Sequence, residues 1–168
     1  MNPVLQLNEF FVEGDNEELS HVLLHIIQTS TPEEEKNKGY FFAVCEINNG
    51  GKDDIYNLQN LMDKIENEYY ESPTEPGKNA LEAILEKINH NHFSLSRPEA
   101  DLNCTVGILR GGEIVFSIHG TPQVLLFYKN REGIYQQIDL LESNEEEGEE
   151  KIFPQIVQGK ISPGDYFF

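Results

Sequence analysis

The chain has 168 residues, of which 38% are apolar and 10% aromatic, so it can bury one sizeable core. Its 30 Asp and Glu residues outnumber its 12 Lys and Arg residues, and the formal charge of −18 disfavours nucleic acid and anionic lipid surfaces as partners. The opening segment lacks the basic start of a signal peptide, and no apolar run has the length of a membrane span. We therefore expect a cytoplasmic protein without direct membrane contact.

Short apolar runs separated by polar turns predict strands in the first third of the chain. The runs are VLQLNEFFV at 4–12, HVLLHIIQ at 21–28 and YFFAVCEI at 40–47. The third run is continuously apolar and ends at a glycine-rich turn, which is typical of a strand buried on both faces. His21 and His25 share one face of the second strand. Polar rim positions are the simpler interpretation of this pair, and a metal-binding pair is the alternative.

The hydrophobic period then changes to that of two amphipathic helices. The first begins near Asp53 or Asp54, either of which can serve as its N-cap, and the second covers 79–90. The Pro- and Gly-rich segment SPTEPG between them predicts an antiparallel pair that packs on a sheet. The apolar stripes are Ile55, Leu58, Met62 and Ile65 in the first helix and Leu81, Ile84, Leu85 and Ile88 in the second.

Strand patterns return after the helices. LNCTVGILR at 102–110 meets EIVFSIH at 113–119 through a two-glycine turn, and QVLLFYK at 123–129 meets GIYQQIDL at 133–140 through a second turn. The acidic segment 142–150 lacks the spacing of a calcium loop and is interpreted as a solvated loop. Strands, a helix pair and a strand meander together predict an α+β domain.

Two pairs of potentially reactive side chains are expected to have no catalytic role. Cys45 and Cys104 both lie in apolar runs, where buried free thiols are the expected state, since nothing else in the sequence indicates an oxidising compartment. Ser117 and His119 share a strand face, but no Asp partner or nucleophile elbow accompanies them. A catalytic triad is therefore not expected.

The order of these pieces resembles that of the metal-dependent PPM-type (type 2C) protein serine/threonine phosphatases. In that family a buried strand ends in an Asp-Gly-x-Gly-Gly-like turn before a helix pair, and a Gly-Asp-Ser-Arg corner and a Pro-Gly-Asp turn follow later. This chain supplies YFFAVCEINNGG at 40–51, GTPQ at 120–123 and SPGD at 162–165. The resemblance spans 40–168. It implies a PPM-phosphatase-like β-sandwich of mainly antiparallel strands with an antiparallel helix pair packed on it.

The same resemblance implies that the family's metal chemistry is degenerate here. PPM phosphatases use a pair of divalent metal ions, held largely by Asp carboxylates, to activate the attacking water. The Asp-Gly pair maps onto Glu46 and Ile47, or onto Asn48 and Asn49 if the loop shifts, so Glu46 is the single candidate metal ligand. The degenerate motif positions are Glu46, Ile47, Gly50, Gly51, Gly120, Thr121, Pro122 and Gln123.

These substitutions predict a catalytically inactive module, a pseudophosphatase that regulates or binds a protein partner. No catalytic residue and no cofactor are expected. Two alternatives stay open. One is an active phosphatase with displaced ligands, which would require Mg²⁺ or Mn²⁺, and the other is a small acidic chaperone-like binding protein.

The end of the sequence bears on domain organisation. Residues 1–168 are interpreted as a single phosphatase-like domain that is incomplete at its C-terminal side. Tyr166, Phe167 and Phe168 begin an apolar strand that stops after three residues, and an unfinished edge invites pairing with another chain. We expect a longer parent protein that tethers the module, and self-association through the edge near Phe168 is an open alternative.

Overall fold

In the computed structural model of this chain, the described residues are 20–27, 31, 33, 37–73, 76–90, 100–140 and 151–168. The strand expected at 4–12 and the acidic loop expected at 142–150 lie outside these residues. The described part combines antiparallel sheets with two helices, which confirms the α+β class predicted from the sequence.

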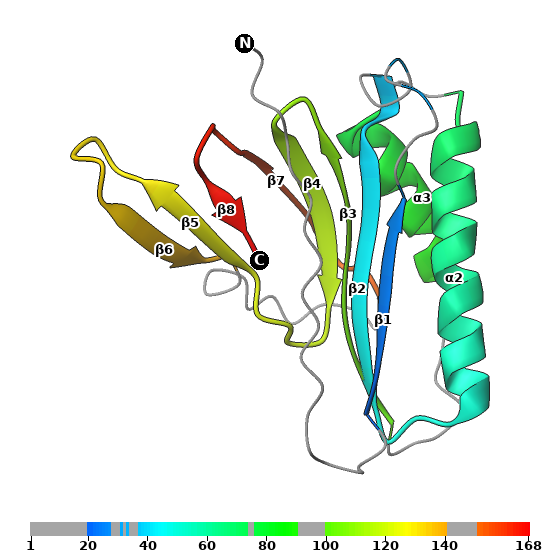
Figure 1. The fold of residues 1–168 in the computed structure, drawn as a ribbon. Coiled ribbons are helices and arrows are strands. Elements are labelled where there is room, and N and C mark those ends of the chain that lie inside the picture. Colours follow the sequence, from blue (N-terminus) through cyan, green and yellow to red (C-terminus); the bar gives the residue numbers. More distant parts are fainter. Residues whose placement is uncertain are drawn as a thin grey trace.

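The strands form two sheets in which every pairing is antiparallel (Figure 1). The larger sheet has the order β1-β2-β3-β4-β7 and the smaller one the order β6-β5-β8. The larger sheet contains β1 (Ser20–Ile27), β2 (Tyr40–Asn48), β3 (Asp101–Arg110), β4 (Glu113–His119) and β7 (Ile156–Lys160). The smaller sheet contains β5 (Leu125–Lys129), β6 (Tyr135–Asp139) and β8 (Tyr166–Phe167).

Both helices cover the same face of the larger sheet (Figure 1). Helix α2 is Lys52–Glu71 and helix α3 is Lys78–His90. Gly51, rather than an aspartate, is the N-cap of α2, and its N–H donates to the Asp54 carboxylate over 2.8 Å. This corrects the expected cap, because Asp54 satisfies the helix start from the third helical position. Among the described residues, neither helix has the length and apolar character needed to cross a bilayer.

The two helical stripes build the core between the helices and the larger sheet, as predicted. Met62, Ile65 and Leu81 are fully buried in it, and Ile55 at the start of the first stripe is only half-buried. Leu58, Ile84, Leu85 and Ile88 complete the buried set. Each buried aliphatic side chain contributes about 1.5–3 kcal/mol, so this helix-side core carries much of the stability of the fold.

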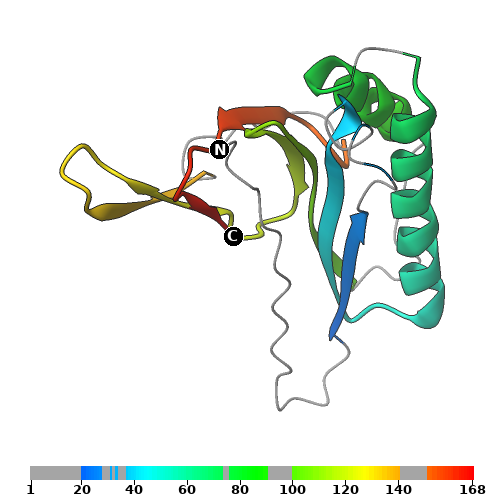
Figure 2. The same ribbon diagram turned by 45° about the horizontal axis from the view of Figure 1, so that its top comes forward.

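A second core lies between the two sheets and makes the fold a sandwich. Phe42, Phe116 and Val124 are buried there, and Phe167 of β8 packs edge-on against Phe42 with ring centroids 6.1 Å apart. Figure 2 shows the β5–β6 hairpin pointing away from the two helices. In the described part of the smaller sheet, β8 is an edge strand, and Phe168 just beyond it is exposed.

Strand β2 is buried on both faces only over part of its length. Its side chains that face the helices are all buried, and Phe42 on the other face is covered by the smaller sheet. Further along that other face Val44 is exposed, so the prediction from the continuously apolar run was too broad. The apolar composition of a strand does not reveal how far the opposing sheet reaches across it.

The antiparallel register of β2 and β3 places Cys45 directly opposite Cys104. Both side chains are buried, and the structure joins their sulfur atoms in a disulfide. The expectation of two free thiols is therefore corrected. The sequence could not reveal this pairing, because the two residues are 59 positions apart and meet only through the strand register.

Candidate functional site

The motif positions taken from the family resemblance meet at one end of the larger sheet. Glu46 of β2 lies opposite Asn103 of β3, and Cys104 lies opposite His119, which brings the following Gly120 next to Asn103. Side chains alternate between the two faces of a strand, so Glu46 and Asn103 share the face that lies away from the helices. We call this group, Ser20, Glu46, Asn103, Gly120 and Thr121, the corner.

Two hydrogen bonds hold the corner together. The Ser20 hydroxyl donates to Oε1 of Glu46 over 3.1 Å, and the backbone N–H of Thr121 donates to Oδ1 of Asn103 over 2.8 Å. Gly120 has φ of +73°, and a Cβ atom there would lie 2.5 Å from Oδ1 of Asn103 and 2.4 Å from the Leu102 carbonyl oxygen. The corner is thus a tight turn closed by an asparagine amide. The shape of this turn comes from Asn103 and Gly120, and no carboxylate of the described residues takes part in it.

The strand-to-helix turn that follows Glu46 has a structural explanation. Ile47 is buried in the helix-side core, and a Cβ atom on Gly50 would lie 2.3 Å from Cγ2 of Ile47. Asn49 adopts a positive φ of 58° in this turn, and Gly51 begins α2. Ile47, Gly50 and Gly51 therefore shape the entry to the helix, and Ile47 points away from the face that carries Glu46.

The remaining motif positions connect β4 to β5. Thr121 and Gln123 are exposed and Pro122 is half-buried. None of these side chains carries a charge, so this turn lacks the acidic and the basic group of the Gly-Asp-Ser-Arg pattern. Sequence reasoning missed Asn103, whose amide holds the turn. Its position at the beginning of a predicted strand, opposite the end of another, was the available signal.

Ser117 and His119 lie on the opposite face, beside the helix-side core. The buried Ser117 hydroxyl donates to the carbonyl oxygen of Gln155 over 2.6 Å. Burial lowers the pKa of His119 below its usual value of 6.5, against a smaller opposing effect of its hydrogen bond to the Ile152 backbone and of the nearby Asp101. The hydrogen bond of the Ser117 hydroxyl thus goes to the backbone.

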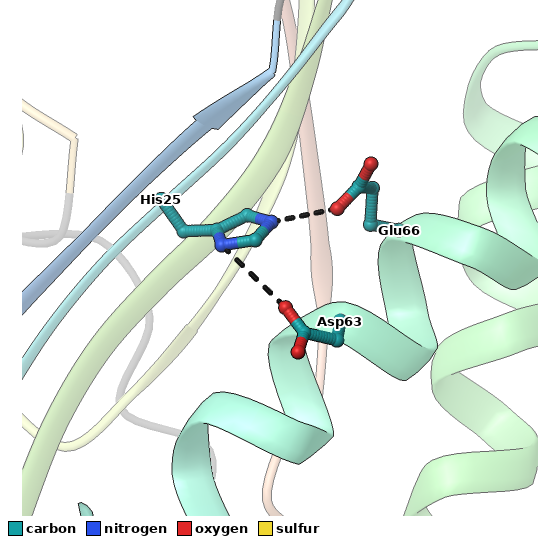
Figure 3. Close-up of side chains that lie close together, drawn as sticks. All are labelled: His25, Asp63 and Glu66. Carbon is teal, nitrogen blue, oxygen red and sulfur yellow. Dashed lines mark hydrogen bonds and ion pairs between the residues drawn. The ribbon is translucent and has the colours of Figure 1, made fainter.

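Among the described residues, the side chains placed closely enough to share a metal ion are His25, Asp63 and Glu66 (Figure 3). They do not include Glu46. His25 lies opposite Ala43 of the helix-side core, whereas Glu46 faces the other way, so the two acidic regions are on opposite faces of the larger sheet. The sequence had indicated His25 only as one of a pair with His21, which is exposed.

Comparisons with known proteins identify the fold. The sequence matches no protein-family model and no curated protein. The fold is similar to that of the phosphatase domain of the cell fate determinant SpoIIE from Bacillus subtilis, in a crystal form without domain swapping, with a TM-score of 0.52. The likeness covers 92% of this chain and 59% of that chain, at 14% sequence identity.

The fold of this chain is therefore PPM-phosphatase-like, as the order of its sequence pieces had predicted. The chain spans less than two thirds of the length of the phosphatase structure that it matches. At this level of identity the similarity establishes the fold, and the activity has to be argued from the residues of the corner.

Proposed function

We propose that this chain is a catalytically inactive PPM-phosphatase-like module that acts by binding a protein partner. One observation carries the proposal: Glu46 is the only carboxylate among the degenerate motif positions, and its Oε1 atom accepts a hydrogen bond from Ser20. Two divalent ions in a phosphatase centre need several oxygen ligands to hold them against water. A lone glutamate does not provide them.

An exposed apolar surface beside the corner supports the protein-binding half of the proposal. Val22, Leu24 and Val44 are 50%, 36% and 45% exposed. They share a face with Glu46, because Val22 lies opposite Glu46 and Leu24 lies opposite Val44. Contiguous exposed apolar side chains with a polar rim are typical of protein contacts. The formal charge of −18 favours a partner that surrounds its apolar contact with basic residues.

A phosphatase assay tests the inactive half of the proposal. The purified chain is incubated with a phosphorylated peptide and with Mn²⁺ or Mg²⁺. Phosphate release is expected to be no faster than in buffer without the protein. The nucleophile in this chemistry is a metal-activated hydroxide, and the corner lacks the ligands to hold the metal. Mn²⁺-dependent hydrolysis that is lost in Glu46→Gln would overturn the proposal. It would support an active phosphatase whose other ligands lie outside the described residues.

A further inference from the structure

A second polar cluster lies where strand β1 meets helix α2, on the face of the larger sheet that the helices cover (Figure 3). Nε2 of His25 is 2.8 Å from Oε2 of Glu66, and Nδ1 of His25 is 3.8 Å from Oδ1 of Asp63. Asp63 and Glu66 are three positions apart on α2 and therefore share a helix face. The potential ligand atoms of the three residues all lie within 4.8 Å of one another.

The positively charged side chains around the cluster do not balance the negative charge of its two carboxylates. Within the described part of the chain, Asp63 and Glu66 form ion pairs with His25 and with no lysine or arginine. When the imidazole is neutral, two carboxylates face one uncharged ring, and the Glu66 side chain is only 18% exposed. Removing charge from water without a counter-charge is costly. A divalent cation would offset both carboxylates.

The histidine is held in place before any ion arrives. Its side chain is 15% exposed, and its ring makes an edge-on contact with the core residue Phe41, with centroids 5.8 Å apart and planes at 81°. Little side-chain freedom remains to be lost when the ring binds a ligand. The Asp63 side chain is 48% exposed and can turn.

We propose that His25, Glu66 and Asp63 bind one divalent transition-metal ion, for which Zn²⁺ is the best probe. Imidazole with carboxylate ligands suits Zn²⁺, with ligand distances of about 2.0–2.2 Å. Two such ligands on a tetrahedral ion are about 3.4 Å apart, so the ion replaces the hydrogen bond between His25 and Glu66 with a small movement. A ring nitrogen binds one ion, so Asp63 turns from Nδ1 toward the ion at Nε2, and water completes the coordination.

An ion at this site would stabilise the fold, and it would not take part in chemistry at the corner. Strand β1 is an edge strand in the described order of the larger sheet, and α2 packs beside it. An ion shared by His25 and the two α2 carboxylates would join this edge strand to the helix. Because His25 and Glu46 lie on opposite faces of the sheet, the ion would be separate from the position of the phosphatase metals.

Calorimetric titration of the chelator-treated chain with Zn²⁺ tests the proposal. We expect saturable binding of one Zn²⁺ per chain. His25→Gln and Glu66→Gln should weaken it by at least about 100-fold, since loss of an outer partner of a metal ligand alone costs about 10–100-fold. Asp63→Asn should have an intermediate effect. His21→Gln is the matched control, because His21 lies on the same strand and the same face but is exposed, and it should bind as the unchanged chain does.

Two further readouts guard against loss of folding in a variant. Zn²⁺ should raise the melting temperature of the unchanged chain and of His21→Gln, and not that of Glu66→Gln, because a ligand that binds only the native state stabilises it. In the unchanged chain, Zn²⁺ should shift the NMR signal of Nε2 of His25 and leave that of His21 in place. Absence of one-to-one binding, or an affinity of His25→Gln and Glu66→Gln equal to that of the unchanged chain, would show that the cluster is only a hydrogen-bonded contact.

Discussion

The two faces of the larger sheet differ most clearly along strand β2. On the face toward the helices, every β2 side chain is buried, and the opposing residues come from the stripes of α2 and α3. On the other face, the smaller sheet covers Phe42 but not Val44, and Glu46 at the end of the strand is only half-buried. One strand therefore contributes both to a closed core and to an open surface.

This difference separates the residues that hold the fold from those available for contacts. Burial of aliphatic side chains under the helices supplies most of the hydrophobic free energy, at about 1.5–3 kcal/mol each. The open face over β1 and β2 contributes little of it, so its residues can change without unfolding the chain. Glu46, the candidate metal ligand taken from the family resemblance, belongs to this open face, and the proposed protein contact lies beside it.

The two faces should differ most in the free energy of unfolding that is lost when a leucine is replaced by alanine. Leu81→Ala on α3 removes a fully buried side chain and should lower the free energy of unfolding by about 2–5 kcal/mol. Leu24→Ala on the open face removes the same atoms and should change it by less than about 0.5 kcal/mol. Denaturant titration of both variants measures the contrast. Similar losses would mean that the open face is part of the core.

A smaller loss is expected where the smaller sheet covers the larger one. In Gly107→Ala, the new Cβ atom would lie 2.6 Å from both Cζ of Phe42 and the Val115 carbonyl oxygen. Overpacking of this kind costs about 1–3 kcal/mol. Gly159→Ala on β7 is the control, because its Cβ atom would meet Cγ2 of Ile114 at an ordinary 3.7 Å. A Gly107→Ala variant as stable as the control in denaturant titration would contradict the close packing of Phe42 and β4 against Gly107.

A weaker and pH-dependent effect should come from His119 beside the helix-side core. Burial lowers its pKa in the folded state below 6.5, so the unfolded chain takes up a proton at this residue more readily. The stability that the neutral ring contributes is present above about pH 6.5 and is lost as the pH falls through the folded-state pKa. Denaturant midpoints should therefore decrease between pH 7.5 and pH 5, and less so in His119→Gln. An equal decrease in both would assign the pH dependence to other groups.

Local patterns in the sequence predicted the frame well. The helical stripes that include Met62 and Leu81 are buried as expected, because the period of apolar residues reflects which side of a helix faces the core. The turn at Gly111 and Gly112 joins β3 and β4 as its two glycines indicated. Ile55 is the exception in the stripes, since it lies in the first turn of α2, at the end of the helix.

Features that depend on distant partners could not be predicted in the same way. The sequence singled out Glu46 through the family resemblance, but the amide of Asn103 that shapes the corner emerged only from the strand register. His25 meets Glu66 across 41 positions, from a strand to a helix, and the pattern of histidines along β1 does not identify that helix. Strand register and helix packing decide which side chains from different elements come into contact. The periodicity of apolar residues along the sequence does not contain this information.

A pair of valine-to-threonine substitutions gives the most direct comparison of the two faces. Val44 of β2 is 45% exposed on the open face, whereas Val106 of the adjacent strand β3 is 0% exposed under the helices. Threonine has nearly the shape of valine and is tolerated in strands, so the substitution mainly adds a hydroxyl group. Val106→Thr buries that hydroxyl and should cost about 1–3 kcal/mol. Val44→Thr leaves it in water and should change the free energy of unfolding by less than about 0.5 kcal/mol in denaturant titration. Equal losses in the two variants would show that Val44 is covered in solution, and the surface proposed for a protein partner would then be closed.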